Sequence, residues 1–230
     1  MSGSLSVDEH TAAPPLSGSS NHEALGYFIL NMRARGFRDT ALLNAIERAP
    51  RTDFLPPDYT EFAYNMLSLP LPCGQEAGSP LSLVEAVGFL QIEAHHHVLE
   101  IGTGSGWQTA LLASLAKAVV SVERWKTLAD AADARLQAAG YSNVVVAHGD
   151  GTGGLPAAAP FDRIIFNAAI EDLSPLIEAQ LAPGGIVLAP VVNGGQQFLI
   201  RFEKQGDRLV QTPLGPANFA AIVPGTADYL

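Results

Sequence analysis

The chain has 230 residues, a formal net charge of −10 and a hydrophobic content of 47%, a composition typical of one globular domain and not of a disordered chain. With 13 basic against 23 acidic residues, it has no basic run to neutralise phosphates, which argues against a nucleic-acid partner. The single cysteine, Cys73, rules out an internal disulfide and fits a reducing cytoplasm. No apolar run is long enough for a membrane span.

The N-terminal part of the sequence predicts a tail, two helices and a long loop. Residues 1–20 are rich in Ser, Pro, Gly and Ala without apolar periodicity, so we expect a disordered tail. Apolar residues then recur at helical spacing over His22–Arg35 and over Asp39–Ala49, where Asp39 is the candidate N-cap. Residues 51–80 are rich in proline and aromatic residues, and long irregular stretches of this kind are often lids or binding loops.

A strand, a glycine loop and a helix form the centre of the sequence. Val98–Ile101 is a short apolar run typical of a strand that is buried on both faces. Gly102, Gly104 and Gly106 follow at alternate positions, directly before the amphipathic run Trp107–Ala116. Glycines at the start of a helix let main-chain N–H groups approach a ligand closely. The stretch therefore predicts a loop that holds a small ligand.

Three carboxylates lie near the ends of three successive predicted strands and indicate which ligand this is. Glu100 lies two residues before the first glycine, Glu123 ends the apolar run 118–123, and Asp150 ends the run 144–150. Each acid alone is also compatible with a solvated strand end, but together they favour a ligand site. The spacing Gly-x-Gly-x-Gly differs from the dinucleotide fingerprint, and a carboxylate beside the loop repels a pyrophosphate and holds a cation. S-adenosylmethionine offers a sulfonium, an ammonium, ribose hydroxyls and an exocyclic amine to such a site.

The remaining elements alternate and predict an α/β fold. Its sheet is doubly wound, mostly parallel and Rossmann-like, with N-terminal helices, an antiparallel C-terminal edge, and the ligand at the carboxyl ends of the strands. We expect a single domain at 21–230, in which 21–80 supplies the N-terminal helices and a substrate loop and 81–230 the cofactor-binding core. The expected elements are helices at Leu81–Leu90 and Leu173–Leu181, strands at Ala118–Glu123, Val144–Asp150, Phe161–Asn167 and Ile186–Pro190, a tight turn at Pro183–Gly185, and a hairpin of Gln197–Glu203 and Arg208–Gln211.

Two further features leave alternatives open or argue against a metal. Trp107 either packs beside the cofactor or lies on the core. His95, His96 and His97 are consecutive, and side chains of an extended chain alternate, so the three cannot all face one metal. We predict solvated turn residues there and no metal site.

Several motifs together resemble the protein-L-isoaspartate O-methyltransferase family, in the same order and with compatible spacing over roughly residues 25–225. The resemblance implies a class I methyltransferase fold, S-adenosylmethionine as the methyl donor, and methylation of the carboxylate of isoaspartyl residues in damaged proteins. The motifs are Arg51–Pro56, Leu69–Pro70 through Gly74–Gln75, Val98–Gln108, Gly149–Gly151 and Leu214–Phe219.

The motifs and the resemblance together predict the cofactor-binding residues. Asn167, at the end of the fourth core strand, is expected close to the transferred methyl group. The full set is Glu100, Gly102, Thr103, Gly104, Gly106, Glu123, Arg124, Gly149, Asp150, Gly151 and Asn167.

The acceptor loop departs from the family pattern, which resembles Gly-Gln-Thr-Ile-Ser-x-Pro with the serine on the acceptor carboxylate. Gly78 stands in place of that serine and Glu76 in place of the threonine, and Ser79 is one residue further on. Loss of one hydrogen bond to a charged group costs about 1.5–3 kcal/mol, which weakens catalysis without abolishing it. A second carboxylate near an anionic acceptor repels it. Gly78, Glu76 and Ser79 are the candidate catalytic positions.

Three hypotheses follow from this departure. The first is an isoaspartyl carboxyl methyltransferase with an altered loop, in which Ser79 is the candidate to replace the missing serine. The second is a methyltransferase redirected to a cationic or hydroxyl-bearing acceptor by Glu76. The third is a cofactor-binding protein without catalysis. The first is preferred, with an isoaspartyl-containing protein or peptide as the partner and a monomer or weak homo-oligomer as the assembly.

Overall fold

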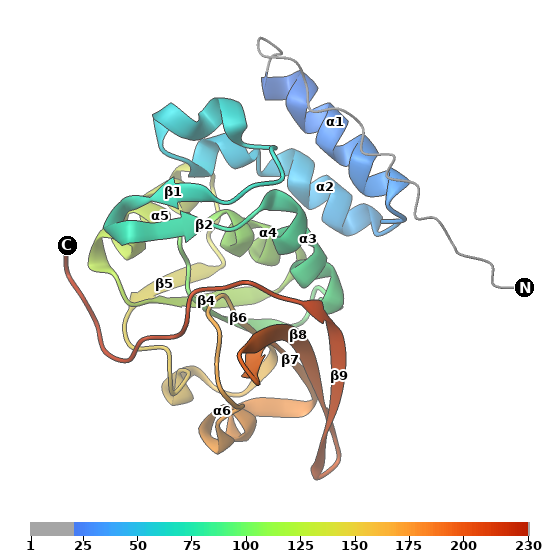
Figure 1. The fold of residues 1–230 in the computed structure, drawn as a ribbon, viewed down its shortest axis with the longest axis vertical. Coiled ribbons are helices and arrows are strands. Elements are labelled where there is room, and N and C mark those ends of the chain that lie inside the picture. Colours follow the sequence, from blue (N-terminus) through green and yellow to red (C-terminus); the bar gives the residue numbers. More distant parts are fainter. Residues whose placement is uncertain (1–20, 230) are drawn as a thin grey trace, which may run out of the picture.

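A seven-stranded sheet forms the centre of the computed structural model, which describes residues 21–229; the predicted tail at 1–20 lies outside these residues. The strand order is β5-β4-β3-β6-β7-β8-β9. The pairs from β5 to β7 are parallel, and β8 and β9 add an antiparallel edge (Figure 1). The predicted fold class is confirmed. The strands are β3 (His97–Ile101), β4 (Ala118–Glu123), β5 (Val144–His148), β6 (Phe161–Phe166), β7 (Leu181–Asn193), β8 (Gln196–Gln205) and β9 (Arg208–Pro216).

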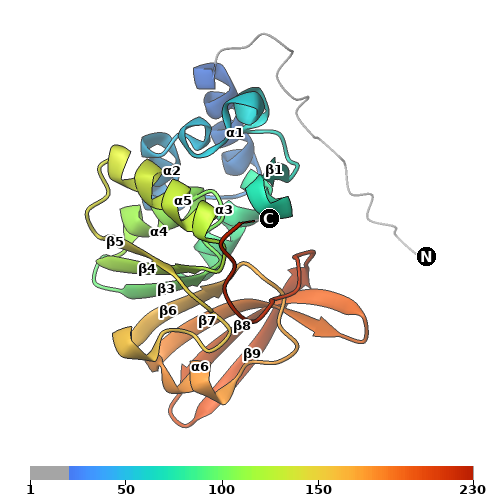
Figure 2. The ribbon, with the colours of Figure 1, turned by 90° about the vertical axis from the view of Figure 1, so that its left-hand side faces the viewer.

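Alternate strand residues supply two apolar layers, because successive side chains of a strand point to opposite faces. Val98 and Ile165 belong to the layer that packs against the helices α1 to α5, whereas Leu99 and Ile164 belong to the layer that packs against α6. In Figure 2 the first five helices lie together on one side. The helices are α1 (Asn21–Ala34), α2 (Thr40–Arg48), α3 (Pro80–Phe89), α4 (Trp107–Leu115), α5 (Lys126–Ala138) and α6 (Pro175–Ala179).

The N-terminal segment forms the two predicted helices and then more regular structure than expected. Asp39 caps α2, since its Oδ1 accepts from the main-chain N–H groups of Ala41 and Leu42 at 2.9 and 3.1 Å. Residues 51–80, predicted to be irregular, contain a two-stranded antiparallel hairpin and three short 3-10 helices. These are β1 (Leu69–Leu71), β2 (Gln75–Ala77), η1 (Arg51–Phe54), η2 (Pro57–Phe62) and η3 (Pro72–Gly74).

Two predicted boundaries near the C-terminal half are wrong. The helix expected at Leu173–Leu181 is shortened to α6, because Ser174 caps it and the chain enters β7 at Leu181. The tight turn expected at Pro183–Gly185 lies inside β7. Gly184 has a φ of +72°, and the pairing of β7 with β6 shifts register there, so the glycines form an irregularity in a continuous strand. The predicted hairpin is confirmed, and its strands are longer than expected.

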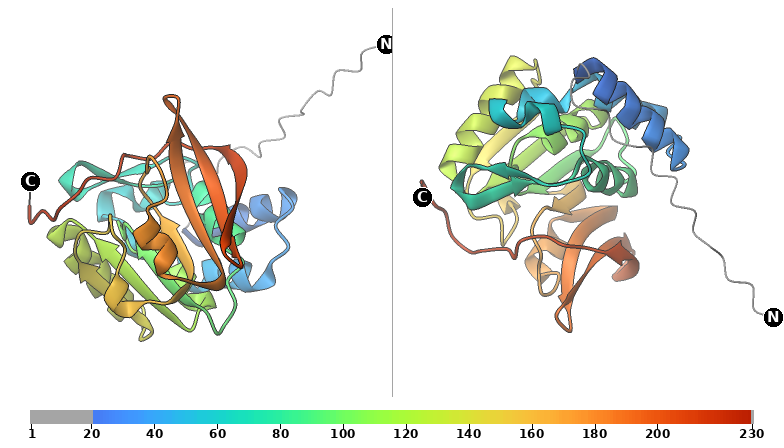
Figure 3. Two further views of the ribbon diagram at one scale, coloured as in Figure 1. Left: turned by 90° about the horizontal axis from the view of Figure 1, so that it is seen from below. Right: turned by 45° about the horizontal axis from the view of Figure 1, so that its top comes forward.

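The segment after β9 crosses the carboxyl ends of the parallel strands, as Figures 1 and 3 show. Ala221 forms a bridge with Ala169, just after β6, and Ala227 forms one with Trp125, just after β4. We call residues 217–228 the C-terminal strap.

No helix within residues 21–229 is long and apolar enough to cross a membrane.

Candidate cofactor and acceptor site

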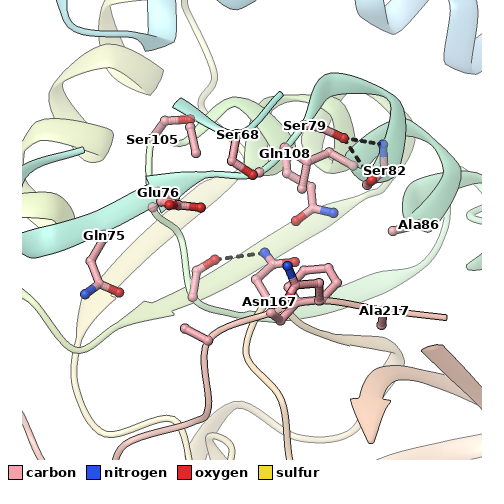
Figure 4. A pocket seen from close by; sticks show the side chains of 18 of the residues that line it. Ser68, Gln75, Glu76, Ser79, Ser82, Ala86, Ser105, Gln108, Asn167 and Ala217 are labelled. Carbon is pink, nitrogen blue, oxygen red and sulfur yellow. Dashed lines mark hydrogen bonds between the residues drawn. The ribbon is translucent and has the colours of Figure 1, made fainter. Parts of the chain in front are cut away.

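A cavity of about 570 Å³ opens at the carboxyl ends of the parallel strands. Its walls come from the β2–α3 region, the glycine loop after β3, the end of β6 and the C-terminal strap (Figure 4). Predicted residues from both the acceptor loop and the cofactor loop meet in it, although they lie far apart in the sequence. The predicted residues that line it are Glu76, Gly78, Ser79, Gly102, Thr103, Gly104 and Asn167.

The glycine loop has the backbone that its sequence predicts. Gly102, Gly104 and Gly106 have φ values of +93°, +56° and +89°, a region that residues with a Cβ rarely adopt. A Cβ on Gly106 would lie 3.2 Å from the Cβ of Ala132, so this glycine also allows α5 to pack closely against the loop. Gly106 does not line the cavity, and its role is to shape the loop.

Glu100 lies beneath the glycine loop and not in the cavity. Its side chain is fully buried. The hydroxyls of Thr109 and Ser121 donate to its Oε2 at 2.5 and 2.6 Å, and the Asn167 amide donates to its Oε1 at 3.2 Å. Burial raises the pKa of Glu100 to about 7, against the opposing effect of these hydrogen bonds. The sequence predicts direct contact with a cation; the structure instead gives Glu100 a position from which it orients Asn167.

Asn167 joins this buried network to the cavity. Its Nδ2 also donates to the main-chain oxygen of Gly102 at 2.8 Å. Thr103, on the loop, is hydrogen-bonded to Ser121 at 2.5 Å, and Ser121 in turn donates to Glu100. The loop is therefore tied to the sheet through side chains of β3, β4 and β6.

Glu123 and Arg124 lie at the end of β4, as predicted. The Oε2 of Glu123 accepts from the main-chain N–H of Gly104 at 3.0 Å, and its Oε1 accepts from that of Trp125 at 3.0 Å. The main-chain N–H of Gly149 donates to the Glu123 carbonyl at 2.9 Å, which holds the ends of β4 and β5 together. The Glu123 carboxylate thus lies beside the glycine loop, at a strand end of the kind where doubly wound folds place the acid that binds ribose hydroxyls.

The strand predicted at Val144–Asp150 ends at His148, so Asp150 lies two residues beyond β5, where it holds the C-terminal strap. Its Oδ1 accepts from the main-chain N–H of Thr152 at 2.9 Å, and its Oδ2 from that of Gly225 at 2.7 Å. These hydrogen bonds lower the pKa of Asp150. A Cβ on the neighbouring Gly151 would lie 2.6 Å from Cγ2 of Ile101, so this position packs directly on β3. Glu123, Arg124, Gly149, Asp150 and Gly151 are outside the lining of the cavity.

The acceptor loop is held from behind by a buried arginine. Nη2 of Arg51 donates to the main-chain oxygen of Gly78 at 2.7 Å, and its guanidinium lies 5.2 Å from the ring centroid of Trp107. Trp107 is fully buried and its Nε1 donates to the Ala49 carbonyl at 2.8 Å, so it belongs to the core. Burial lowers the pKa of Arg51 to about 10.

The hydroxyl of Ser79 is already engaged. It accepts from the main-chain N–H of Ser82 at 3.2 Å as the N-cap of α3, and it donates to the Ser82 hydroxyl at 2.8 Å. Glu76 is exposed on β2. Glu85 also lines the cavity, and burial raises its pKa. Among the lining residues there are two carboxylates and no Lys, Arg or His.

Arg51, Glu85 and Gln108 were not among the functional residues predicted from the sequence. Arg51 and Gln108 stand there only as the first and last residues of two family motifs, Arg51–Pro56 and Val98–Gln108. The signal available in the sequence was position alone, since Gln108 follows the last glycine of the loop by two residues.

The histidine run is arranged differently from the prediction. His95 and His97 are exposed, as expected, but His96 is 5% exposed and its Nδ1 accepts from the main-chain N–H of Glu93 at 2.8 Å. His95, His96 and Glu93 carry potential ligand atoms within 4.8 Å of one another, because the chain turns here and is not extended. His97 begins β3, and its main-chain N–H donates to Asp162 at 2.8 Å.

A parallel sheet with an antiparallel C-terminal edge, a glycine loop after β3 and acids at the ends of β4 and β5 defines a class I methyltransferase. The family model of protein-L-isoaspartate(D-aspartate) O-methyltransferase (PCMT) matches residues 23–227. The chain belongs to this family.

Individual relatives agree with the family match. A protein-L-isoaspartate O-methyltransferase of Maricaulis maris (strain MCS10) is 41% identical over 202 residues, which cover 88% of this chain and 95% of the relative. A protein-L-isoaspartate O-methyltransferase of Rhodopseudomonas palustris (strain BisB5) is 43% identical over 204 residues, which cover 88% of this chain and 94% of the relative.

Solved structures share the fold. A Plasmodium falciparum structure, described as a protein-L-isoaspartate O-methyltransferase in complex with S-adenosyl-L-homocysteine, has a TM-score of 0.78 at 18% identity. The match covers 89% of this chain and 99% of that one. A second protein-L-isoaspartate O-methyltransferase structure has a TM-score of 0.76 at 23% identity and covers 86% of this chain and 65% of that one.

Proposed function

We propose that this chain transfers a methyl group from S-adenosylmethionine to the free carboxylate of L-isoaspartyl residues in damaged proteins. The observation that carries the proposal is the cavity, in which the acceptor loop after β2 faces the glycine loop after β3. Membership of the family over residues 23–227 supports the same activity.

The donor fits the residues that are present. Gly102, Thr103, Gly104 and Asn167 line the cavity and would contact the amino-acid end of the donor. Glu123 and Asp150 lie outside the lining of this cavity but near the ends of the neighbouring strands β4 and β5, where they would accept from the ribose hydroxyls and from the adenine amino group. Two carboxylates in the cavity wall suit a donor that carries a sulfonium and an ammonium. When bound, S-adenosylmethionine supplies an electrophilic methyl group.

The acceptor needs no general base. A carboxylate with an ordinary pKa near 4 is ionised at neutral pH, so the work of the protein is to align the acceptor oxygen with the methyl group and to exclude water. A carboxylate oxygen forms the bond to the methyl carbon as the carbon–sulfur bond breaks and its electron pair stays on sulfur. The products are a methyl ester and S-adenosylhomocysteine.

A second candidate function is methylation of an altered acceptor. The specific observation in its favour is that Glu76 and Glu85 line the cavity without a basic partner among the lining residues. Carboxylates there repel an anionic acceptor and attract a cationic one. A cationic or hydroxyl-bearing acceptor therefore suits Glu76 and Glu85 better than a carboxylate does. If the acceptor is an isoaspartyl residue, the same two carboxylates should favour a peptide with a neighbouring lysine or arginine over one with a neighbouring glutamate.

The experiment that tests the proposal is methyl transfer from labelled S-adenosylmethionine to an isoaspartyl peptide, with the aspartyl peptide as the control. The wild type and a Gly78→Ser plus Glu76→Thr variant are compared. A Cβ on Gly78 would lie 3.2 Å from Cδ2 of Leu83, closer than an ordinary contact, so the Leu83 side chain has to shift slightly to accommodate the serine. We expect the wild type to methylate only the isoaspartyl peptide. The rate of methyl transfer by the variant should be at least roughly tenfold higher, because the variant regains a hydrogen bond to a charged group.

Two outcomes contradict this proposal. If the wild type is silent and only the variant is active, the acceptor of the natural protein lies outside isoaspartyl peptides. If the wild type binds S-adenosylhomocysteine but neither protein methylates any peptide, the chain is a cofactor-binding protein.

We further infer a monomer or weak homo-oligomer in a reducing cytoplasm, without a nucleic-acid partner. The single cysteine supports the reducing compartment, and the net charge of −10 supports the absence of a nucleic-acid partner. Light scattering on the full chain at two concentrations tests the oligomeric state.

A further inference from the structure

Gln108 is a buried amide that faces the cavity without a hydrogen-bond partner. It lies in the first turn of α4, is 3% exposed and lines the cavity. Neither Nε2 nor Oε1 has a partner among residues 21–229. Figure 4 shows its amide pointing into the pocket, between Ser79 and Ser82 on one side and Asn167 on the other. Leaving both atoms of a buried amide unpaired is costly, so this position is built for a ligand.

The other buried glutamine of the chain is fully paired, which makes Gln108 an exception. Gln180 is also 3% exposed. Its Oε1 accepts from the main-chain N–H of Leu155 at 2.7 Å, and its Nε2 donates to the carbonyls of Gly153 and Leu176 at 2.8 and 2.7 Å. The fold therefore supplies partners to a buried amide where the amide serves the structure alone.

The side-chain amide of Gln197 shows how a glutamine in this protein pairs with a peptide main chain. Its Nε2 donates to the main-chain oxygen of Phe219 at 2.9 Å, and its Oε1 accepts from the N–H of the same residue at 2.8 Å. Phe219 lines the same cavity. One glutamine amide thus pairs with both main-chain groups of one residue, as a neighbouring strand does in an antiparallel ladder.

We propose that Gln108 binds the acceptor peptide in the same manner, with Nε2 donating to a main-chain carbonyl and Oε1 accepting from the N–H of one substrate residue. The ligand must offer an acceptor and a donor side by side, because both atoms of the amide are unpaired. A carboxylate alone offers acceptors only and would leave Oε1 without a partner. An extended peptide residue offers both, as does the amino-acid end of the donor, and the position of the Gln108 amide beside Ser79 and Ser82 on the acceptor side of the cavity favours the peptide.

This inference rests on the proposed function and adds a rule for substrate recognition. Main-chain groups are the same in every sequence, so a contact through Gln108 selects a peptide without selecting its side chains. An enzyme that acts on damage at arbitrary positions needs recognition of this kind, and the acidic wall of Glu76 and Glu85 adds a charge preference to it.

The first test is Gln108→Met, which keeps an unbranched side chain of similar length and removes both polar atoms. We expect the KM for an isoaspartyl peptide to rise about tenfold, the loss of two net hydrogen bonds, with kcat and the affinity for S-adenosylhomocysteine within twofold of wild type. The melting temperature should stay the same or rise, because two unpaired buried atoms are removed. Gln211→Met, at an exposed position of β9, is the matched control and should change none of these values.

The second test identifies the groups that Gln108 contacts. Binding of isoaspartyl peptides that are N-methylated at single amides is measured by calorimetry in the presence of S-adenosylhomocysteine, so the readout does not depend on turnover. We expect one N-methyl position to weaken binding to the wild type and to have no effect on binding to Gln108→Met.

Three results would overturn the inference. One is an unchanged peptide KM in Gln108→Met. Another is a loss of S-adenosylhomocysteine affinity with normal peptide binding, which would assign Gln108 to the amino-acid end of the donor. The third is a lowered melting temperature with unchanged kinetics, which would make Gln108 structural. A wild type that binds the peptide but does not methylate it would contradict the proposed function alone.

Discussion

At the scale of single residues, Glu100 shows how a motif position differs from its apparent role. A carboxylate before a glycine loop suggests contact with a cation, yet three side chains surround it with hydrogen bonds inside the protein. Its carboxyl group acts through Asn167, whose amide donates to both Glu100 and Gly102. Glu100 is thus a positioning residue for the loop.

The raised pKa of Glu100 predicts that the free energy of unfolding depends on pH. Its pKa of about 7 in the folded protein lies above the ordinary value of 4.5, so the folded state binds the proton more tightly than the unfolded chain. This contribution to the free energy of unfolding is fully present below pH 4.5 and is lost as the pH rises through 7. A shift of this size corresponds to about 3 kcal/mol.

Urea unfolding of the wild type and of Glu100→Gln across this pH range measures the effect. Relative to the variant, which does not titrate at this position, the wild type should lose about 3 kcal/mol of stability between pH 4.5 and pH 8. Parallel stability curves for the two proteins would show that Glu100 keeps an ordinary pKa in the folded state.

At the scale of elements, the acceptor loop depends on an arginine from η1. Arg51 donates to the Gly78 carbonyl and lies over Trp107, while Nε and Nη1 have no hydrogen-bond partner among residues 21–229. Arg51→Lys keeps the charge but loses the planar fork and the stacking. We expect the free energy of unfolding to fall by about 1–3 kcal/mol, and the KM for the peptide to rise because the loop is less well held.

Chemical denaturation and steady-state kinetics on Arg51→Lys test this link, with the exposed Arg48→Lys on α2 as the control. A variant with lowered stability and an unchanged KM would separate Arg51 from the acceptor loop and leave it as a core residue only.

The C-terminal strap depends on Asp150, which also stands where the adenine amino group is expected. Asp150→Ala removes the acceptor for the Gly225 N–H. We expect faster amide hydrogen exchange over residues 225–228 and an affinity for S-adenosylhomocysteine at least tenfold weaker, because both the base contact and the strap are affected. Asp150→Asn, which keeps an acceptor oxygen, should restore the exchange rates more fully than the affinity. Unchanged exchange in Asp150→Ala would mean that other contacts hold the strap.

The accuracy of the sequence predictions varied between elements for physical reasons. β4 matches its predicted bounds because a β-branched run between polar ends leaves little choice of register. The β1–β2 hairpin was missed because each strand has three residues and prolines stand in and beside it. Gly184 and Gly185 were read as a turn, although a strand tolerates them at an irregularity. The role of Gln108 was invisible, since only tertiary structure shows which amides lack partners.

At the scale of the whole molecule, ligand binding should stabilise the fold measurably. A ligand that binds the folded state alone adds about 2.7 kcal/mol at a concentration of 100 times its Kd. For a chain of 230 residues this corresponds to a rise in melting temperature of roughly 5–10 °C. Differential scanning fluorimetry with S-adenosylhomocysteine measures this rise. NAD is the control, because the loops that bind it have a different glycine spacing. Equal shifts with both ligands would contradict the assigned donor.

The cavity wall is built from segments that lie far apart in the sequence, and this has a consequence for how the protein folds. The wall combines β2, the loop after β3, the end of β6 and the strap, which follows the last strand. Contacts between segments so distant in sequence require large loops to close and therefore form late. The sheet and its helices can assemble before the pocket exists. During refolding, the recovery of secondary structure should therefore precede the recovery of ligand binding. The docking of the C-terminal strap should set the time at which the protein first becomes able to bind its donor.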